Sequence, residues 1–583
     1  MSAPNRNTLW GRVLADELAA AGVSAVCLAP GSRSTPLTVA FGQHPDIGTF
    51  SHLDERSAAF FALGRAKRTG EVTPLVCTSG TAAANFHPAV IEASQARVPL
   101  LLLTADRPPV IRDSGANQTI DQEKLYGDAV RWYRDLPEPE PTPRKLRSLR
   151  TDAARAVGTA TGTHPGPVHL NVPFRKPLEP TEVPGDVPAD LAERAPLAVE
   201  GRDGPFVEVT QGRPEVAAAD AERVAAALDA AERGLVVAGP ADTDGLTAEA
   251  LAALADATGF PVLADPLSDL RYGPHTEGGV VCGGYDSYLA AAADWPDPEV
   301  VLRFGASPTS KPLRHYLRDH ADRQFVVDPA GEWREAEFTA TDLVVADPSG
   351  FAADLAEQVS DPGSEEYAAR FADAEAAYWD LVADAHAEQF FEGTVLGDAA
   401  ALAPDPATLF VSNSMPVRDL DRFGAPRQAD LTVLGNRGAS GIDGITSTAL
   451  GAGSATDDPL VLVTGDLAYY HDMNGLLALS RCGVDATVVL VNNDGGGIFR
   501  VLPIEGHETF EDLFRTPHGL DFAPTGDLYD FEFVSVDNRA GFRAAYEESL
   551  ASDGTQVVEV GTDSERSHRF REAVHERVVD RLS

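Results

Sequence analysis

Two short motifs in the last third of the chain combine groups that bind a divalent cation and a phosphate. Gly465-Asp466 ends one apolar run, and 27 residues after Asp466 a second run ends at Asn493, followed by the glycines 495–497. A right-handed β-α-β unit brings the carboxyl ends of its strands together, so Asp466, Asn493 and the backbone carbonyl of Gly495 could reach one cation. Such oxygen ligands suit Mg²⁺, or Mn²⁺, when diphosphate fills the remaining positions, and the glycines let backbone N–H groups approach phosphate. Taken alone, each motif is more typical of an ordinary α/β turn.

The joint pattern resembles the diphosphate-binding signature of the thiamine-diphosphate enzymes, although Leu467 stands where the signature commonly has a third glycine. The resemblance implies a carboxyl group that faces N1′ of the aminopyrimidine and promotes deprotonation of the thiazolium C2. Glu55 fits this role, because it follows a predicted strand (49–54) and precedes a predicted helix (56–68). The alternative for Glu55 is an acid that the dipole of this helix stabilises. Its coincidence with the diphosphate motif favours the catalytic role.

Nine strings in order along the chain resemble a narrower family, the MenD family. They are APGSRSTPL (29–37), LDERSAAFFALGRAK (53–67), TSGTAAANFHPAVIEAS (78–94), LTADRPP (103–109), GANQTIDQ (115–122), SNSMPVRDLD (412–421), NRGASGIDG (436–444), GDLAYYHDMNGL (465–476) and NNDGGGIFRVLP (492–503). This family synthesises 2-succinyl-5-enolpyruvyl-6-hydroxy-3-cyclohexene-1-carboxylate (SEPHCHC) in menaquinone biosynthesis. The resemblance implies a transferase that decarboxylates 2-oxoglutarate with thiamine diphosphate and adds the succinyl semialdehyde carbanion to isochorismate in a 1,4-addition. It also implies a homodimer or homotetramer, because two domains of this superfamily meet across a subunit interface.

The implied substrates, 2-oxoglutarate and isochorismate, are both dicarboxylates, so a strongly acidic protein needs a local cationic pocket to hold them. Guanidinium forks bind carboxylates bidentately, although any single arginine could instead form a surface ion pair. The candidates are Arg33, Arg107, Lys311, Arg418 and Arg437.

Other positions take their roles from the resemblance. Hydrogen bonds to substrates or intermediates are implied for Ser32, Asn117, Gln118 and Ser414. Ile442 would prop the cofactor in its bent form, with plain core packing as the alternative. Lys311 is followed by Pro312 where some family members have a second basic residue, and Arg314 is the nearest replacement. For His471, expected to begin a helix, and His518, in a turn, a structural role is favoured.

These residues must be positioned by parallel sheets, because strands alternate with helices along the whole chain. Polar and glycine-rich segments end the apolar runs, at the edge where α/β sheets bind ligands. We predict three parallel-sheet α/β domains of the thiamine-diphosphate-binding fold: a pyrimidine-binding domain (1–180), a central domain (215–350) and a diphosphate- and metal-binding domain (365–583). A segment rich in Pro, Gly and charge (173–214) is the predicted linker, and helices are predicted over 214–231, 364–389 and 472–482.

Composition narrows the class of protein further. The 583 residues carry 89 Asp and Glu against 47 Lys and Arg, a net charge of −42, and only five of the basic residues are Lys. Such a surface repels polyphosphate, so no nucleic-acid partner is expected. It indicates a halophilic protein of a salt-accumulating cytosol. The four cysteines lack zinc spacing, and neither a signal peptide nor a membrane span is present, which predicts a cytoplasmic enzyme.

Two rival functions remain at this stage. Another thiamine-diphosphate-dependent 2-oxo-acid decarboxylase or carboligase would act on monocarboxylates, and PGSRS and NRGASGIDG argue against it. A binding or scaffold protein that had lost its chemistry would lack Glu55, Asp466 or Asn493, and all three are present.

Overall fold

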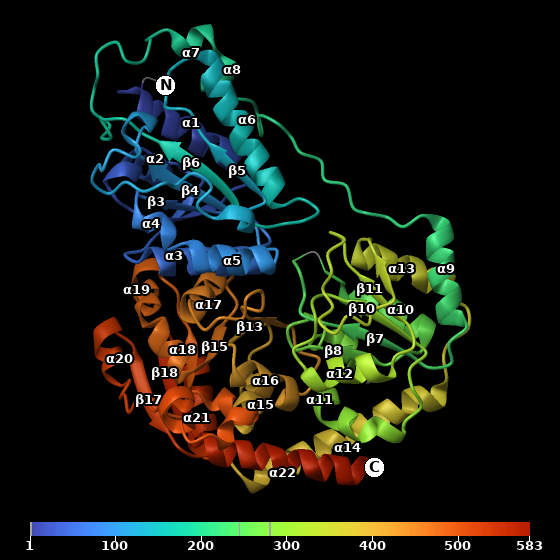
Figure 1. Ribbon diagram of the computed structural model, residues 1–583. Coiled ribbons are helices and arrows are strands. Elements are labelled where there is room, and N and C mark those ends of the chain that lie inside the picture. The colour runs from blue at the N-terminus through green and yellow to red at the C-terminus, as the bar shows by residue number, and fades with distance from the viewer. Residues whose placement is uncertain (1–2, 244, 279–280) are drawn as a thin grey trace. The chain divides into compact units, whose positions relative to one another are not determined.

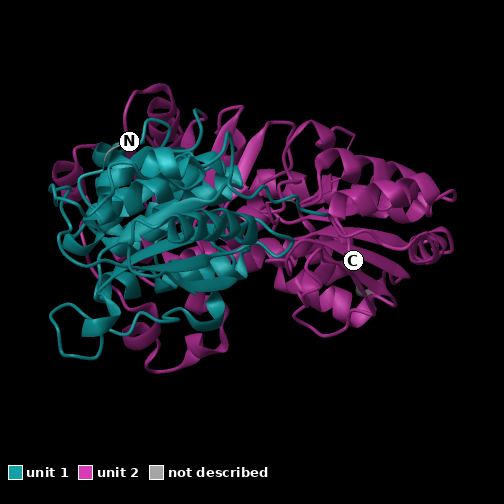
Figure 2. Cartoon of the chain, turned by 90° about the horizontal axis from the view of Figure 1, so that it is seen from above, with its two compact units in different colours: residues 1–212, 436–457, 472–484 teal, residues 213–435, 458–471, 485–583 magenta. Residues whose placement is uncertain are grey.

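The computed structural model describes residues 3–243, 245–278 and 281–583 (Figure 1). Within these residues the strands form three six-stranded sheets, and every strand pair in them is parallel. The chain divides into two compact units, coloured in Figure 2. The first comprises residues 1–212, 436–457 and 472–484, and the second comprises residues 213–435, 458–471 and 485–583. No described helix combines the length and apolar character needed to cross a membrane.

The first unit contains a sheet in the order β2-β1-β3-β4-β6-β5. Its strands are β1 (Ala25–Ala29), β2 (Gly48–Ser51), β3 (Thr73–Cys77), β4 (Leu100–Asp106), β5 (Trp132–Asp135) and β6 (Val168–Pro173). The helices along this stretch are α1 (Arg6–Ala20), α2 (Thr35–Gly42), α3 (Glu55–Thr69), α4 (Thr81–Ala84), α5 (His87–Gln95) and α6 (Pro143–Ala160). The chain reverses its direction across the sheet between β1 and β3, which is where α/β sheets of this kind open a ligand crevice.

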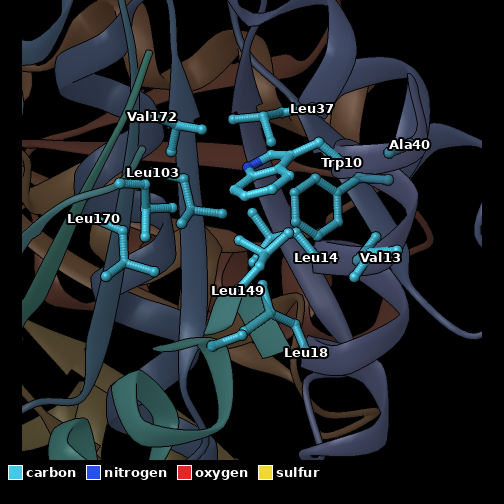
Figure 3. Close-up of a cluster of buried hydrophobic side chains, with 14 of the residues drawn as sticks. Trp10, Val13, Leu14, Leu18, Leu37, Ala40, Leu103, Leu149, Leu170 and Val172 are labelled. Carbon is cyan, nitrogen blue, oxygen red and sulfur yellow. The ribbon is translucent and has the colours of Figure 1, made fainter. Parts of the chain in front are cut away.

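The core of this sheet is built on the apolar face of α1. Trp10, Leu14 and Leu18 are buried, and they pack with Leu103 of β4 and Leu170 of β6 (Figure 3). The segment with linker composition contributes to the same core, because α7 (Leu191–Arg194) and α8 (Pro196–Val199) bury Leu191, Ala198 and Val199. The segment predicted as a linker from its proline and charge content therefore contains two short helices that pack against the core.

Two helices of the first unit touch through their backbones. A Cβ at Gly64 of α3 would lie 1.9 Å from the carbonyl oxygen of Thr448, and a Cβ at Gly451 would lie 1.9 Å from that of Phe61. Thr448 and Gly451 belong to α17 (Ile445–Gly453). Only glycine permits this approach, so the pair fixes α17 directly against the helix that begins with Glu55.

The second unit contains the other two sheets. The central one runs β12-β11-β10-β7-β8-β9, and its strands are β7 (Gly234–Ala238), β8 (Val262–Ala264), β9 (Val281–Cys282), β10 (Val300–Phe304), β11 (Gln324–Val327) and β12 (Asp342–Val344). Its helices include α9 (Ala218–Asp229), α10 (Ala248–Thr258), α11 (Tyr285–Tyr288), α12 (Lys311–His320) and α13 (Pro348–Gln358). α9 starts four residues later than predicted, since the carbonyl oxygen of Pro214 accepts a hydrogen bond from the Asp347 N–H at 2.8 Å.

The C-terminal sheet runs β14-β13-β15-β16-β18-β17, so it repeats the strand order of the first sheet. Its strands are β13 (Ala407–Val411), β14 (Leu431–Leu434), β15 (Leu460–Gly465), β16 (Thr487–Asn492), β17 (Glu532–Val536) and β18 (Gln556–Gly561). The helices of this part include α14 (Glu365–Glu388), α15 (Glu392–Leu402), α16 (Met415–Phe423), α18 (Asp466–His471), α20 (Pro524–Tyr529), α21 (Arg539–Ala551) and α22 (Ser564–Leu582). These two sheets therefore share one plan.

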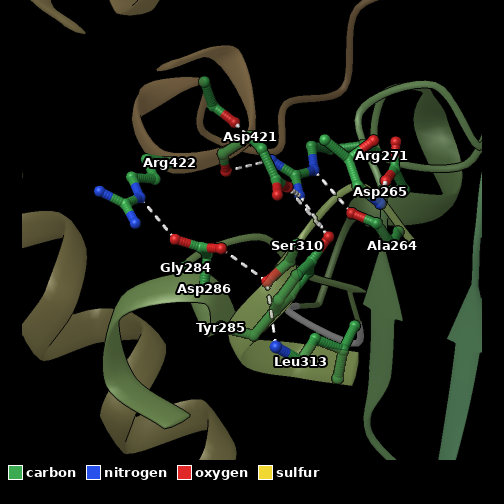
Figure 4. A network of polar contacts seen from close by, with 12 residues as sticks. Ala264, Asp265, Arg271, Gly284, Tyr285, Asp286, Ser310, Leu313, Asp421 and Arg422 are labelled. Carbon is green, nitrogen blue, oxygen red and sulfur yellow. Dashed lines mark hydrogen bonds and ion pairs between the residues drawn. The ribbon is translucent and has the colours of Figure 1, made fainter. Parts of the chain in front are cut away.

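Buried ion pairs join α16 to the central sheet (Figure 4). Arg271, which follows β8 and is fully buried, donates to the Asp421 carboxylate at 2.7 Å and to the Tyr285 hydroxyl at 3.0 Å. The Arg422 guanidinium contacts the Asp286 carboxylate at 2.5 Å, and Asp286 also accepts from Ser310 at 2.6 Å. Charged pairs that are both buried and hydrogen-bonded fix geometry strongly, so the position of α16 is set from the central sheet.

Candidate functional site

Asp466 lies at the carboxyl end of β15, as predicted, and is only 3% exposed. Its carboxylate accepts from the Leu467 N–H at 2.7 Å and from the Gly495 N–H at 2.9 Å. Burial raises the pKa of Asp466 although these hydrogen bonds oppose the shift. A nearby cation would stabilise the charged form of this carboxylate.

Asn493 begins the turn after β16. The nitrogen and the oxygen of its side-chain amide have different surroundings. Its Nδ2 donates to Glu392 Oε1 at 2.8 Å. Its Oδ1 is buried and has no hydrogen-bond partner within the described part of the chain. A buried carbonyl oxygen without a partner is costly, and a hard cation is the ligand that would satisfy it.

The turn that follows Asn493 requires glycine. Gly495 has φ +143°, and a Cβ there would lie 2.2 Å from the carbonyl oxygen of Arg515. Its N–H is the one that reaches Asp466, so the turn and the strand end are held together. One carboxylate, one amide oxygen and a glycine turn fit a magnesium diphosphate site. The described residues contain no cluster of three or more His, Cys, Asp and Glu side chains that could hold a metal.

His518 also faces Asp466, with its Nε2 3.2 Å from Oδ2. The N–H groups of His518 and Gly519 donate to the Asp494 carboxylate at 2.9 and 2.7 Å, which fixes the loop that carries the imidazole. The sequence favoured a structural role for this histidine, whereas the structure places it against the predicted metal ligand. Local sequence carries no signal for this contact, because 52 residues separate the two side chains.

The expected helix over 472–482 is wrong in its start. A helix begins at Asp466 itself and ends at His471, which is therefore a C-terminal rather than a first residue. Residues Met473–Leu477 form a short 3-10 helix, and Ala478–Cys482 form the short α-helix α19. Asp472 interrupts the helix because its buried carboxylate accepts from the Ser447 N–H at 2.6 Å and from the Ser447 hydroxyl at 3.2 Å.

Three of the predicted substrate residues of the second unit follow strand ends. Ser414, which precedes α16, has φ +73°, an uncommon conformation for a non-glycine residue that marks many functional sites. Its carbonyl oxygen accepts from the Arg418 guanidinium at 2.6 Å. Lys311 is exposed in the first turn of α12, where a cation is opposed by the helix dipole. Arg314 forms an ion pair with Glu337 at 3.3 Å.

Glu55 is the first residue of α3, in the first unit, and is half-buried. The N-cap of this helix is Asp54, whose side chain accepts from the Arg56 N–H at 2.8 Å and from the Ser57 N–H at 3.4 Å. Because Asp54 performs the capping, the Glu55 carboxylate is not needed for it. Glu55 also adds to burial in raising the pKa of the Cys77 thiol, so the two groups are near one another.

Arg33 and Arg107 form a cationic pair at the ends of β1 and β4. Burial and the positive charge of Arg107 lower the pKa of Arg33. Arg33 donates to the carbonyl of Phe174 at 2.6 Å, and Arg107 donates to that of Asn117 at 2.7 Å. The Nε atoms of both arginines are buried without a partner in the described residues. Two adjacent guanidinium groups with unused donors are a typical environment for a carboxylate.

The remaining polar candidates of this unit lie at the surface beside the pair. Ser32, Asn117 and Gln118 are exposed. The carbonyl oxygen of Gln118 accepts from the Ser79 hydroxyl at 3.0 Å, which fixes the loop to the end of β3. Their side chains are therefore available to a ligand.

The loop that carries Arg437 and Ile442 is held by Glu92 of α5. The buried Glu92 carboxylate accepts from the N–H groups of Gly438 at 2.8 Å and Ala439 at 2.6 Å. Arg437 and Ile442 are both partly buried. Glu92 was missed from the sequence, since 346 residues separate it from Gly438.

Comparisons with known proteins identify the same three domains. The chain matches the models for the N-terminal thiamine pyrophosphate (TPP) binding domain of thiamine pyrophosphate enzymes at residues 10–125, the middle domain at 204–411 and the C-terminal TPP binding domain at 423–560. A solved structure, the thiamine diphosphate-dependent 4-hydroxybenzoylformate decarboxylase of Rhodococcus jostii RHA1, has the same fold. It aligns with a TM-score of 0.68 at 17% identity, over 95% of this chain and 99% of that one.

Curated relatives extend over the whole chain. Proteins of Haloarcula marismortui and Natronomonas pharaonis are 67% and 66% identical, each covering 100% of both chains. A protein of Roseiflexus castenholzii is 49% identical over 96% of this chain and 97% of its own. All three are named 2-succinyl-5-enolpyruvyl-6-hydroxy-3-cyclohexene-1-carboxylate synthase. With identity this high from end to end, the chain belongs to the SEPHCHC synthase family of thiamine-diphosphate-dependent enzymes.

Proposed function

We propose that this protein forms SEPHCHC and CO₂ from 2-oxoglutarate and isochorismate, with thiamine diphosphate as cofactor and Mg²⁺ or Mn²⁺ as the metal. The observation that carries this proposal is a buried Asp466 carboxylate, joined to the Gly495 turn, beside a strand end where Asn493 Oδ1 is buried without a partner among the described residues. With the carbonyl of Gly495, they would hold the metal. Gly465 would leave room for the diphosphate, because a Cβ at this position meets nothing within 4 Å.

When bound, thiamine diphosphate supplies the electron sink for loss of CO₂ and for carbon–carbon bond formation. Glu55 would hold the proton shared with N1′ of the aminopyrimidine and thereby promote proton loss from C2. Ile442 would be the apolar residue that supports the cofactor in its bent form. The capping of α3 by Asp54 supports this assignment, because it leaves the Glu55 carboxylate available.

The charged residues would select a dicarboxylate over a monocarboxylate. Arg33 and Arg107 would bind carboxylates through donors that the described residues leave unused. Arg437, shortly after β14, would contribute further positive charge, as would Arg418 in α16 and Lys311 at the start of α12. Ser32, Asn117, Gln118 and Ser414 would orient the substrates by hydrogen bonds. Because the chain carries a net charge of −42, retaining so many cations beside strand ends supports a specific anion site.

We further propose a cytoplasmic homodimer or homotetramer with domains at 1–180, 215–350 and 365–583. The acidic, lysine-poor composition supports a location in a salt-accumulating cytosol. Light scattering in molar KCl would measure the assembly, and a monomer would contradict this part of the proposal.

The test is an assay in molar KCl with Mg²⁺, thiamine diphosphate, 2-oxoglutarate and isochorismate, in which the product is identified by mass. We expect both substrates to be consumed with release of CO₂. Decarboxylation without loss of isochorismate would favour the alternative, another 2-oxo-acid decarboxylase or carboligase. A matched reaction with pyruvate in place of 2-oxoglutarate should be slow, because pyruvate lacks the second carboxylate.

A further inference from the structure

Glu392, the first residue of α15, contacts the amide nitrogen of the predicted metal ligand Asn493. Glu392 is 2% exposed, and its Oε1 accepts from Asn493 Nδ2 at 2.8 Å and from the Thr562 hydroxyl at 3.2 Å. Its other oxygen contacts the Arg571 guanidinium. Both oxygens of this carboxylate are therefore used.

The contact determines which end of the Asn493 amide is presented to a ligand. A carboxylate only accepts hydrogen bonds, whereas an amide has one accepting and one donating end. Asn493 must therefore turn its Nδ2 toward Glu392, which leaves Oδ1 on the opposite side. This explains why Oδ1 is the buried atom without a partner in the described residues.

Arg571 is held in turn from α16. It donates to both carboxylate oxygens of Asp419, at 2.6 and 2.5 Å, and Asp419 is 1% exposed. Asp419 is next in sequence to Arg418. The buried chain Asn493–Glu392–Arg571–Asp419 thus connects the predicted metal ligand to the helix that carries a predicted substrate arginine.

We propose that Glu392 is a positioning residue for the metal site: it fixes the Asn493 amide so that Oδ1, and not Nδ2, faces the metal. Hydrogen-bonded partners of metal ligands commonly set ligand orientation, and their loss typically lowers metal affinity by about 10- to 100-fold. The inference rests on the proposed role of Asn493 as a metal ligand. It adds a residue that contacts neither the metal nor the substrate.

The substitution Glu392→Gln tests the orientation argument. Arg571 has only donors, so the carbonyl of the introduced glutamine should face Arg571 and its NH₂ group should face Asn493. Asn493 would then rotate and present its own NH₂ group to the metal. We expect Mn²⁺ affinity, measured by calorimetry in the presence of thiamine diphosphate, to fall by roughly 10- to 100-fold.

A second variant separates orientation from general damage. Asn493→Asp alone places two carboxylates against each other and should also weaken Mn²⁺ binding. In Glu392→Gln/Asn493→Asp, the glutamine NH₂ group can donate to one oxygen of the introduced aspartate, and the other oxygen can bind the metal. We expect the double variant to bind Mn²⁺ at least about tenfold more tightly than Asn493→Asp or Glu392→Gln alone. Glu388→Gln is the matched control, because Glu388 is half-exposed and pairs with Arg577 at the surface.

Three results would overturn the proposal or its foundation. Unchanged Mn²⁺ affinity in Glu392→Gln would refute the positioning role. Losses in both single variants without recovery in the double variant would make Glu392 a purely structural residue. Unchanged Mn²⁺ affinity in Asn493→Ala would instead refute the metal site of the proposed function. If Asn493→Ala loses affinity and Glu392→Gln does not, the metal site stands and only the positioning role is refuted.

Discussion

Replacing Asp472 by asparagine should make the protein more stable at neutral pH and leave its stability unchanged in acid. The Asp472 carboxyl is fully buried and contacts the Ser447 N–H and hydroxyl, with the Arg56 guanidinium 3.9 Å away. Burial raises its pKa from 3.8 to about 6. Asparagine can accept from the same N–H and donate to the same hydroxyl without burying a charge.

The size of the effect follows from the shift in pKa. Each pKa unit corresponds to about 1.36 kcal/mol, so a change from 3.8 to about 6 corresponds to about 3 kcal/mol. Because the folded state binds this proton more tightly, the contribution is fully present below pH 3.8 and is lost as the pH rises through about 6. Above that pH, Asp472→Asn should gain up to about 3 kcal/mol, because the pKa shift already includes the opposing attraction to Arg56.

Urea unfolding in molar KCl between pH 4 and pH 8 would measure this difference. The free energies of unfolding of the variant and the parent should converge near pH 4 and separate between pH 4 and pH 7. Asp457→Asn, at an exposed position, is the control and should show no such separation. A variant that is equally destabilised at every pH would refute the reasoning.

Three other perturbations have defined outcomes. Arg271→Met should lower the free energy of unfolding by about 3–5 kcal/mol, because the buried Asp421 carboxylate loses its ion-pair partner. In the same urea assay, Arg271→Met/Asp421→Leu should recover most of the loss. Glu92→Ala should raise the KM for 2-oxoglutarate by about tenfold, because the loop that carries Arg437 loses its anchor. Leaving the N–H groups of Gly438 and Ala439 without an acceptor costs roughly 1–3 kcal/mol each. An unchanged KM would contradict the anchoring role. Lowering KCl from molar to about 0.1 M should reduce the thermal midpoint and the activity, since a net charge of −42 is then poorly screened; equal values at both concentrations would contradict halophilic adaptation.

The sequence was informative about the residues that end strands. Polar and glycine-rich segments after β1, β4, β13, β15 and β16 were predicted to gather at sheet edges, and parallel pairing places them there. Asp466 and Asn493 were found because each lies next to a recognisable strand end. Only short helical segments over 466–482 separate the two strands, so local pattern was enough.

Contacts between distant parts of the chain could not be predicted in this way. Glu392 lies 101 residues before Asn493, and Glu92 lies 346 residues before Gly438. Glu392 begins α15 and Glu92 lies within α5, and neither has a local feature that distinguishes it from a surface acid. The break at Asp472 was missed for the same reason, because its cause is a tertiary contact with Ser447.

The most direct test of the account is the exchange of the C2 proton of bound thiamine diphosphate in Glu55→Gln. Deuterium exchange would be followed by magnetic resonance in molar KCl with Mg²⁺, and cofactor affinity would be measured on the same samples. If Glu55 moves the proton, exchange should slow by about 10²–10⁴-fold while the cofactor still binds. Exchange at the parental rate in a variant that binds the cofactor normally would contradict the assignment of Glu55.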